Sequence, residues 1–440
     1  MTSIIPISSR RMIVGAVAAL GLALVLVIVI AMFTASQTRS KRLEKAANNG
    51  NAAAQFRLSL RYEYGQGVPQ SYRKAMVWCR KAASAGDTNA MTAIGWLYQR
   101  GQGVPRNYQK AMTWYRKAAS AGDTNAMTMI GWLYQRGQGV PRNYQKAMAW
   151  YRKSVNGGDV GAMYDIGLLY AHGQGVAQSY AKALTCYRKA AAADVSQAMG
   201  AISTLYEHGW GVRKSYQKAM IWLRKAAAAG NAIAMYNIGW LYEHGRGVPR
   251  NYQKAMNWYR KSAAGGSKHA MMGIGRLYAH GLGTGQNYNM ARVWFRKAAA
   301  AGDVHAIYII GYLYAYGKGV PRNYRKAMDW YKKAAAGGNA SAMNNIGMLY
   351  YRGLDVPRNY QKALAWYRKA ASAGDAEAMD NIGWSYGHGL GVKRGYHETM
   401  AWFRRAAAGG NTDAMGSIGF RNRSRAIVAN LAHKRGFPII

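Results

Sequence analysis

One residue recurs along this chain with a strict period that leaves few folds open. A tyrosine stands at every thirty-sixth position through ten consecutive units between Asn51 and Gly410. These are Tyr72, Tyr108, Tyr144, Tyr180, Tyr216, Tyr252, Tyr288, Tyr324, Tyr360 and Tyr396. Six Val-Pro pairs, from Val68-Pro69 to Val356-Pro357, keep the same register. Self-similarity with a period of roughly 20 to 50 residues predicts a repeat architecture and argues against a single globular core.

Each unit is predicted to contain two amphipathic helices, as residues 87–122 illustrate. Asp87 is a favourable N-cap, and the first helix then carries an apolar stripe at helical spacing, namely Ala90, Ile94, Leu97 and Tyr98. A turn from Gly101 to Pro105 ends this helix. Asn107 caps a second helix, whose apolar stripe is Tyr108, Ala111, Met112, Tyr115 and Ala119. The same N-cap column of the first helices holds Asn51, Asp87, Asp123, Asp159, Asn231, Asp303, Asn339 and Asp375.

Stacking is how such hairpins bury their apolar faces, because one hairpin alone leaves much of that surface in water. We therefore expect an all-α fold, a right-handed α/α solenoid of about ten 36-residue helix-turn-helix repeats over residues 51–419. Residues 34–50 are expected to form a short basic linker and a half-repeat, and residues 420–440 a basic C-terminal cap or tail.

An uncharged apolar run of 22 residues, residues 12–33, precedes the repeats. A helix needs about 20 apolar residues to cross the bilayer core. The run is longer than the apolar region of a cleaved signal peptide, which spans about 7 to 15 residues. We therefore predict one transmembrane helix, an uncleaved single-pass anchor, after a short N-terminal tail of residues 1–11.

The side of the membrane on which the solenoid lies stays open. Two basic residues precede the apolar run and four follow it: Arg10, Arg11, Arg39, Lys41, Arg42 and Lys45. This bias favours a cytoplasmic solenoid. A short N-terminal tail before a long apolar run suits an export anchor equally well. We give a slight preference to a periplasmic or extracytoplasmic solenoid.

Residues 126–158 carry the repeat nearly intact, as A-M-x-x-I-G-x-L-Y-x-x-G-x-G-V-P-x-N-Y-x-K-A-M-x-W-Y-R-K-A-A-x-x-G. Over about 370 residues this pattern resembles the Sel-1-like repeat, a relative of the tetratricopeptide repeat. The resemblance implies an adaptor or scaffold that binds other proteins, here as a membrane-anchored member of the family. Some exported bacterial members carry a cysteine pair in each repeat and have been linked to cell-wall precursors, but this chain lacks those pairs.

The charge of the chain constrains its partners. Lys and Arg number 60 against 17 Asp and Glu, which gives a net charge of +43. Such a charge predicts anionic partners, such as acidic proteins, anionic lipid or a cell-wall polymer. We disfavour nucleic acid, because the predicted anchor holds the array near lipid. The two cysteines, Cys79 and Cys186, lie about three units apart, beyond the ~7 Å Cα limit for a disulfide.

Much of this charge recurs as a basic dyad, usually Arg-Lys, in the second helix of each unit. The residues that we single out as a candidate anionic-surface stripe are Arg116, Lys117, Arg152, Lys153, Arg224, Lys225, Arg260 and Lys261. A solvated outer face and a stripe that binds a polyanion explain them equally well. Near anionic lipid, each basic residue contributes about 1 kcal/mol to membrane binding.

A partner-binding groove is expected where the units differ. Counted from the N-cap as position 1, the first helix varies at positions 3, 6, 7 and 10. The candidate groove residues are Trp96, Trp132, Tyr164, Tyr236, Trp240, Tyr308, Tyr312, Asn344, Asn345, Asp380, Asn381 and Trp384. Aromatic side chains there suit the anchoring of a partner segment. The alternative is packing between neighbouring first helices, because large apolar side chains usually find burial.

Two further columns have structural explanations. The histidines at the end of the first helices are His172, His208, His244, His280 and His388. Adjacent units place these rings about 10 Å apart, whereas zinc needs ring nitrogens at ~2.0 to 2.1 Å. A role at the helix C-terminus, where a cation complements the helix dipole, therefore explains them better than a metal ladder. The tryptophan column from Trp78 to Trp402 is expected to serve packing.

No set of residues for catalysis emerges, since the sequence has neither a phosphate-binding loop nor an H-E-x-x-H motif. We therefore expect no enzyme, no metal, no cofactor and no small-molecule substrate. The leading hypothesis is a membrane-anchored scaffold or adaptor that binds partner proteins, acidic ones above all, through the groove face. The alternative is a binder of polyanions or anionic surfaces, such as wall polymer or anionic lipid, that uses the stripe. The third, which we rank last, is a cell-wall-linked enzyme.

Overall fold

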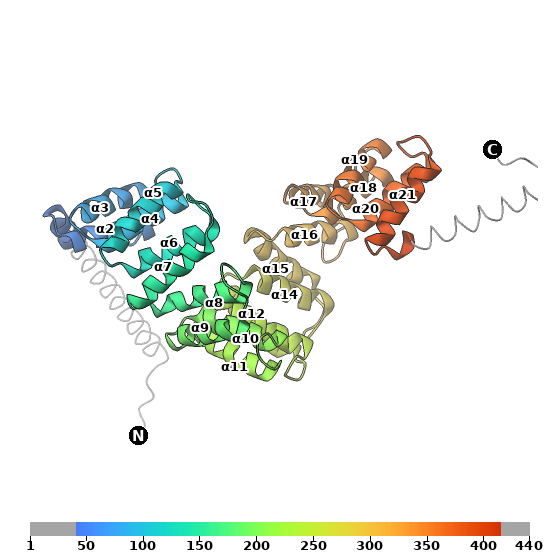
Figure 1. The fold of residues 1–440 in the computed structure, drawn as a ribbon. Helices are drawn as coiled ribbons and strands as arrows, with labels where there is room; N and C mark the ends of the chain where they lie inside the picture. Colours follow the sequence, from blue (N-terminus) through green and yellow to red (C-terminus); the bar gives the residue numbers. More distant parts are fainter. Residues whose placement is uncertain (1–40, 415–440) are drawn as a thin grey trace, which may run out of the picture. The chain divides into compact units, whose positions relative to one another are not determined.

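The computed structural model describes residues 41–414, and within this span the chain forms helices joined by tight turns, with no strand (Figure 1). The first helices of the units are α2 (Ala52–Tyr64), α4 (Thr88–Arg100), α6 (Thr124–Arg136), α8 (Met163–His172), α10 (Ser196–His208), α12 (Ala232–His244), α14 (Lys268–His280), α16 (Val304–Tyr316), α18 (Ala340–Arg352) and α20 (Ala376–His388). The second helices are α3 (Tyr72–Ser84), α5 (Tyr108–Ser120), α7 (Tyr144–Asn156), α9 (Tyr180–Ala192), α11 (Tyr216–Ala228), α13 (Tyr252–Ala264), α15 (Tyr288–Ala300), α17 (Tyr324–Ala336), α19 (Tyr360–Ser372) and α21 (Tyr396–Ala408). The predicted all-α solenoid of tandem repeats is confirmed.

The predicted terminal segments are not part of this description. The tail of residues 1–11, the transmembrane helix of residues 12–33 and the C-terminal cap of residues 420–440 lie outside the described residues. Among the helices of residues 41–414, none is both long and apolar enough to cross a membrane. Residues 41–48 are helical, and Ala47 packs on Ala54 and Leu58 of α2.

Helix caps fix the ends of the first helices as the sequence predicts. Asp87 Oδ1 accepts a hydrogen bond from the Ala90 amide at 2.9 Å, and Gly101 ends α4 in the left-handed region at φ +72°. The same N-cap bond is made by Asn51, Asp123, Asn231, Asp303, Asn339 and Asp375. Each cap satisfies an amide that the helix itself leaves unpaired.

The predicted cap at Asp159 is wrong. Its side chain makes no capping bond, and a short 3₁₀ helix, Val160–Ala162, precedes α8. The Asp159 carboxylate instead accepts hydrogen bonds from the hydroxyls of Thr128 and Ser154, at 3.0 and 3.1 Å. These hydroxyls belong to the preceding unit, and they compete with the amides that a cap would bind.

In eight of the ten described hairpins, the core contains a glycine of the first helix that meets an aromatic ring of the second, whereas α2 and α10 carry Ser59 and Ser203 at this position. A Cβ atom on Gly95 of α4 would lie 2.5 Å from Cε1 of Tyr115, so only glycine lets α4 and α5 approach this closely. The Tyr115 ring is fully buried, as are Ala90, Ile94 and Leu97 of the predicted stripe. The same glycine–aromatic contact recurs at Gly131, Gly167, Gly239, Gly275, Gly311, Gly347 and Gly383.

The described helices fall into two compact bodies, each made of several repeats, of which one ends at Arg213 and the other begins at Lys214. Within each body, a helix packs chiefly on the helices immediately before and after it in the sequence. The buried apolar residues accordingly form a succession of clusters along each body, as the stacking of neighbouring helices implies.

Candidate partner-binding surface

The first-helix face, which we define as positions 3, 6, 7 and 10 of the first helices, carries all twelve predicted groove residues. At position 6 the rings of Tyr164, Tyr236 and Tyr308 are half-buried. Each lies against the buried tyrosine of its own second helix, at centroid distances of 5.8 Å to Tyr187, 5.5 Å to Tyr259 and 5.9 Å to Tyr331. These tyrosines thus pack against their own hairpin, and part of each ring stays open to solvent.

Position 10 carries aromatic rings that stack on the side chain one helical turn later. The Trp96 ring lies 4.5 Å from the Arg100 guanidinium, and the Trp132 ring 5.4 Å from that of Arg136. The corresponding ring pairs are Trp240–His244 at 4.2 Å, Tyr312–Tyr316 at 4.4 Å and Trp384–His388 at 4.2 Å. Trp384 is 44% exposed. Trp384 is the exposed member of the predicted groove residues, and the other position-10 rings are half-buried.

Near α18 and α20, polar groups replace the aromatic ones. Asn344 is buried, accepts a hydrogen bond from the Asn381 amide at 3.0 Å, and donates one to Glu377 at 3.2 Å. Burial, and then the charges of Asp413 and Glu377, together raise the pKa of the Asp380 carboxyl to about 6. Asn345 hydrogen-bonds the Tyr308 phenol, which opposes the rise in its pKa caused by burial. For Asn344 and Asn381, packing between neighbouring first helices is thus the observed role.

The histidine column lies in the last turn of the first helices, as predicted. Nδ1 of His244 lies 2.9 Å from the Trp240 carbonyl, and Nδ1 of His388 lies 3.0 Å from that of Trp384. These contacts hold each imidazole ring against the last turn of its own helix. Within residues 41–414, no three His, Cys, Asp or Glu side chains gather in a way that could hold a metal ion.

The arginines of the candidate stripe tie consecutive units together. Their guanidinium groups donate to tyrosine hydroxyls of the next first helix: Arg116 to Tyr134 at 3.1 Å, Arg224 to Tyr242 at 3.4 Å and Arg260 to Tyr278 at 2.9 Å. The residues of the stripe, Arg152 included, are nevertheless exposed. Their charge is therefore still presented to solvent.

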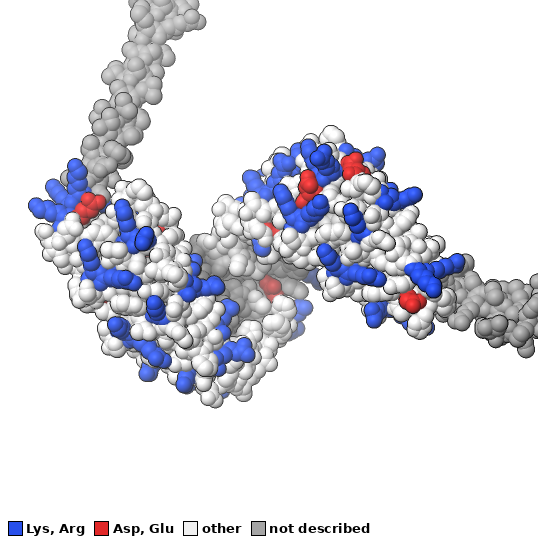
Figure 2. All heavy atoms as spheres, turned by 90° about the horizontal axis from the view of Figure 1, so that it is seen from above, with Lys and Arg blue, Asp and Glu red and all other residues white. Residues whose placement is uncertain are grey.

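The lysines of the stripe cover the tryptophan column. The ammonium groups of Lys117, Lys153, Lys225 and Lys261 lie 4.8, 4.6, 4.7 and 4.6 Å from the ring centroids of Trp114, Trp150, Trp222 and Trp258. These rings are half-buried rather than in the core. Figure 2 shows Lys and Arg spread over the visible face of the described helices, with few Asp or Glu among them.

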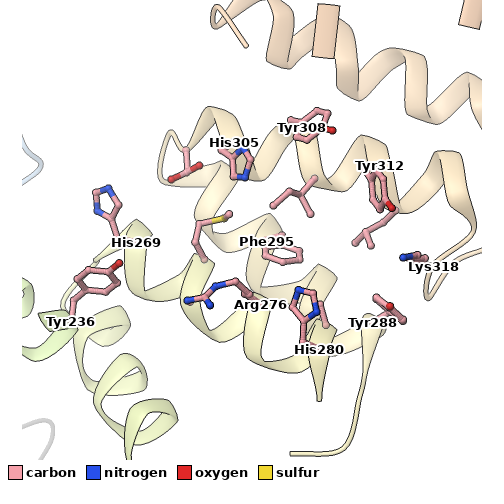
Figure 3. A pocket seen from close by; sticks show the side chains of 16 residues that line it. Tyr236, His269, Arg276, His280, Tyr288, Phe295, His305, Tyr308, Tyr312 and Lys318 are labelled. Carbon is pink, nitrogen blue, oxygen red and sulfur yellow. The ribbon is translucent and has the colours of Figure 1, made fainter. Parts of the chain in front are cut away.

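A hollow of about 620 Å³ opens on the first-helix face between α14 and α16, and we call it the α14–α16 pocket (Figure 3). Its walls are mostly aromatic or apolar, with Arg276, Lys318 and three histidines as the basic groups. The lining residues are Tyr236, His269, Met272, Gly273, Arg276, Ala279, His280, Tyr288, Phe295, Asp303, His305, Tyr308, Ile309, Tyr312, Leu313 and Lys318. A concave, mainly apolar site with a few placed polar groups is the usual form of a ligand site.

One wall of this pocket is held by a buried carboxylate. Glu243 of α12 is 4% exposed, and its Oε2 accepts hydrogen bonds from the Tyr259 hydroxyl at 2.6 Å and Arg276 Nη2 at 2.8 Å. Arg276 Nη1 lies 2.5 Å from Oε1 of the same carboxylate. A two-pronged contact of this kind fixes the guanidinium plane. Arg276 therefore points back toward α12, as Figure 3 shows.

The sequence prediction brought Tyr236, Tyr308 and Tyr312 into this site but missed its basic groups. Arg276 stands at position 10, where most other units carry an apolar residue, and His269 and His305 are the histidines at position 3. These departures from the repeat could have indicated the basic groups of the site. The depth of the hollow could not be predicted in the same way, because it results from side chains that are absent.

Comparison with protein families gives one repeat model that matches ten times. The Sel1 repeat matches residues 52–87, 88–123, 124–159, 160–195, 196–231, 232–267, 268–303, 304–339, 340–375 and 376–411. These matches begin one residue after the N-cap column and cover the whole run of hairpins described above. A search among proteins of curated function gives no match.

Two solved structures resemble the chain in both sequence and fold. A protective antigen present in uropathogenic Escherichia coli strains, which displays an SLR fold, is 32% identical at a TM-score of 0.57. That match covers 87% of this chain and 82% of the antigen. A Sel1 repeat protein from Oxalobacter formigenes is 33% identical at a TM-score of 0.51, and 57% of this chain covers 100% of it.

Proposed function

Because this chain belongs to the Sel1 repeat family, whose members bind protein partners, we propose that it is a membrane-anchored scaffold that binds partner proteins through its first-helix face. Stacked repeats present extended surfaces of this kind and need no catalytic residues to do so. Residues 12–33 provide the anchor in this proposal, and the solenoid lies on the extracytoplasmic side.

One observation carries the proposal: within the first helices, an accessible position varies from unit to unit, whereas a buried position is constant. Position 4 is the same buried alanine in every unit, from Ala54 to Ala378. Position 10 instead holds Trp96, Thr204, Arg276 or Tyr312, all partly accessible or exposed. Packing alone would repeat at both positions. Variation at an accessible position supports a surface fitted to particular partners.

Photo-crosslinking tests the choice of face. A benzoylphenylalanine placed at Trp96, Trp132 or Trp240 is expected to capture a partner in cells. The matched control sites are Gln109, Gln145 and Gln253, which are exposed on the second helices. Equal capture at both sets would contradict the proposal, because the partner would then contact the second helices as often as the first-helix face.

Alanine substitution then tests the anchors. The triple variant Trp96→Ala, Trp132→Ala and Trp240→Ala is expected to weaken binding of the captured partner at least about tenfold, since aromatic anchors dominate interface energies. Helical content, measured by circular dichroism, is expected to stay that of the unsubstituted chain. Unchanged affinity in a folded variant would rule out these side chains as anchors.

A second candidate function is supported by the exposed dyads. Cation–π contacts leave the charge of the stripe in place, so these residues can also bind an anionic lipid surface or wall polymer. Replacing all eight stripe residues by Gln is expected to release the chain from phosphatidylglycerol vesicles at lower salt. The control removes the same charge elsewhere, at Arg106, Lys110, Arg142, Lys146, Arg213, Lys214, Arg250 and Lys254. If both variants lose vesicle binding equally, the net charge of the chain explains the binding and the stripe has no specific role.

A further inference from the structure

The α14–α16 pocket lies in a unit that lacks two side chains present in several other units. In three of the described units the buried tyrosine of the second helix donates to position 13 of the first helix, as Tyr115 does to Gln99 and Tyr151 to Gln135, both at 2.7 Å. In residues 267–302 the tyrosine is replaced by Phe295 and the acceptor by Ala279. Both halves of that hydrogen bond are therefore missing, and the space between α14 and α16 is left open.

The neighbouring position 10 does not fill this space either. Arg276 is drawn toward α12 by Glu243, so its guanidinium leaves the side of α14 that faces α16. Gly273 adds no side chain, and a Cβ there would lie 3.0 Å from the Tyr259 ring, which is a tight contact. The hollow thus depends on packing on the opposite side of α14.

The charges around the pocket favour an anion. Lys318 lies 5.4 and 5.6 Å from the ring centroids of Tyr312 and Tyr288, and it makes no ion pair within the described part of the chain. Asp303 is the one acidic lining residue, and its carboxylate is engaged in capping α16. The Glu243 charge is buried and paired with Arg276. Among the lining residues, Lys318 therefore carries the full positive charge that is left unpaired for an incoming anionic group.

We propose that this pocket binds an acidic segment of a partner protein, with a large apolar side chain over Phe295 and an adjacent carboxylate on Lys318. The proposal rests on the scaffold function above, and it states which kind of partner segment binds at this part of the first-helix face. The aromatic and apolar walls desolvate the apolar side chain, and the net charge of +43 draws acidic segments toward the surface.

Peptide binding to the full chain in detergent micelles tests this proposal. The probe is a fluorescein-labelled, amidated peptide, Gly-Asp-Phe-Leu-Asp-Gly, followed by fluorescence anisotropy. Two matched probes replace Asp by Asn or Phe-Leu by Ala-Ala. The acidic apolar probe is expected to bind at least about fivefold more tightly than either matched probe. One matched probe lacks the carboxylates and the other lacks the large apolar side chains. Equal binding of all three would overturn the proposal.

Two variants locate the binding. Ala279→Gln with Phe295→Tyr rebuilds the pair seen at Gln99 and Tyr115, fills the hollow, and is expected to lower affinity about tenfold or more. Lys318→Gln installs the residue that the first four units carry at this position. It is expected to lower affinity for the acidic probe about fivefold and to leave the Asn probe unaffected. Lys332→Gln, on the exposed side of α17, removes the same charge and is expected to change affinity less than about twofold.

The possible outcomes separate this inference from the scaffold proposal. If the filled variant binds the acidic probe like the unsubstituted chain, or if Lys318→Gln and Lys332→Gln behave alike, the pocket assignment fails. Partner capture at Trp96 and Trp132 would still stand in that case. If crosslinking shows no privileged face while the probe binding depends on Lys318, the pocket stands and the scaffold proposal fails. Because Lys318 is at the surface, its variant stays informative even if the filled variant does not fold.

Discussion

At the scale of single residues, the glycine that eight of the described first helices share, such as Gly95, lets the hairpin close on an aromatic ring. Gly95→Ala is expected to destabilise the α4–α5 hairpin by ~1–3 kcal/mol, because the Tyr115 ring is fully buried and cannot withdraw. Gly200→Ala in α10 is the matched control, since a Cβ there meets nothing within 4 Å. It is expected to stabilise by ~0.5–1 kcal/mol. Amide hydrogen exchange of the two helix pairs measures both effects, and equal effects would contradict the close-contact explanation.

A buried acid in α8 makes the stability of this region depend on pH. Burial, and then the charge of Asp159, raise the pKa of Asp165 to about 6. The folded state therefore holds a proton that the unfolded state has lost between about pH 4 and 6, so stability falls as pH rises through this window. Asp165→Asn is expected to remove that decline and to raise the melting temperature at neutral pH.

The comparison is with Asp329→Asn, which removes the same charge at an exposed site on α17. Melting temperatures of both variants and of the unsubstituted chain, recorded by circular dichroism across this range, decide the matter. A parallel pH dependence in all three would show that Asp165 carries no such penalty.

At the scale of helices, the arginine–tyrosine bonds are expected to couple one unit to the next. The Arg260 guanidinium in α13 donates to the Tyr278 hydroxyl in α14 at 2.9 Å. Arg260→Met and Tyr278→Phe are each expected to lower the stability of α14 by about 1 kcal/mol, and the double variant by little more than either. Hydrogen exchange in α14 closes this double-mutant cycle. Strictly additive losses would show that the bond contributes nothing.

The helices were predictable because their signals repeat, whereas the pocket depends on exceptions. N-caps such as Asp87 and stripes such as Ile94 and Leu97 are local features that the fold preserves. Asp159 was mispredicted because its competing partners, Thr128 and Ser154, lie in another unit. The α14–α16 pocket was out of reach because it depends on where Arg276 turns. That direction is set by Glu243, which is 33 residues away in the sequence.

At the scale of the whole molecule, the proposed anchor makes a direct prediction about fractionation. The full chain is expected to stay with membranes after alkaline carbonate extraction, and a variant without residues 1–33 is expected to be released. Protease digestion in intact and opened cells then reports the side of the solenoid. Release of the full chain by carbonate would contradict the anchor. Release of the truncated chain only at high salt would instead point to the basic stripe.

The nearest-neighbour packing of the helices also has a mechanical consequence. In the described part of each compact body, a helix packs chiefly on its neighbours in the sequence. An end repeat can therefore peel away while the rest stays folded. Pulled between an anchor and a bound load, such an array would lengthen in steps. Each freed repeat of 36 residues adds on the order of 120 Å of extended chain. A scaffold of this construction is an extensible tether, which yields under force one helical hairpin at a time.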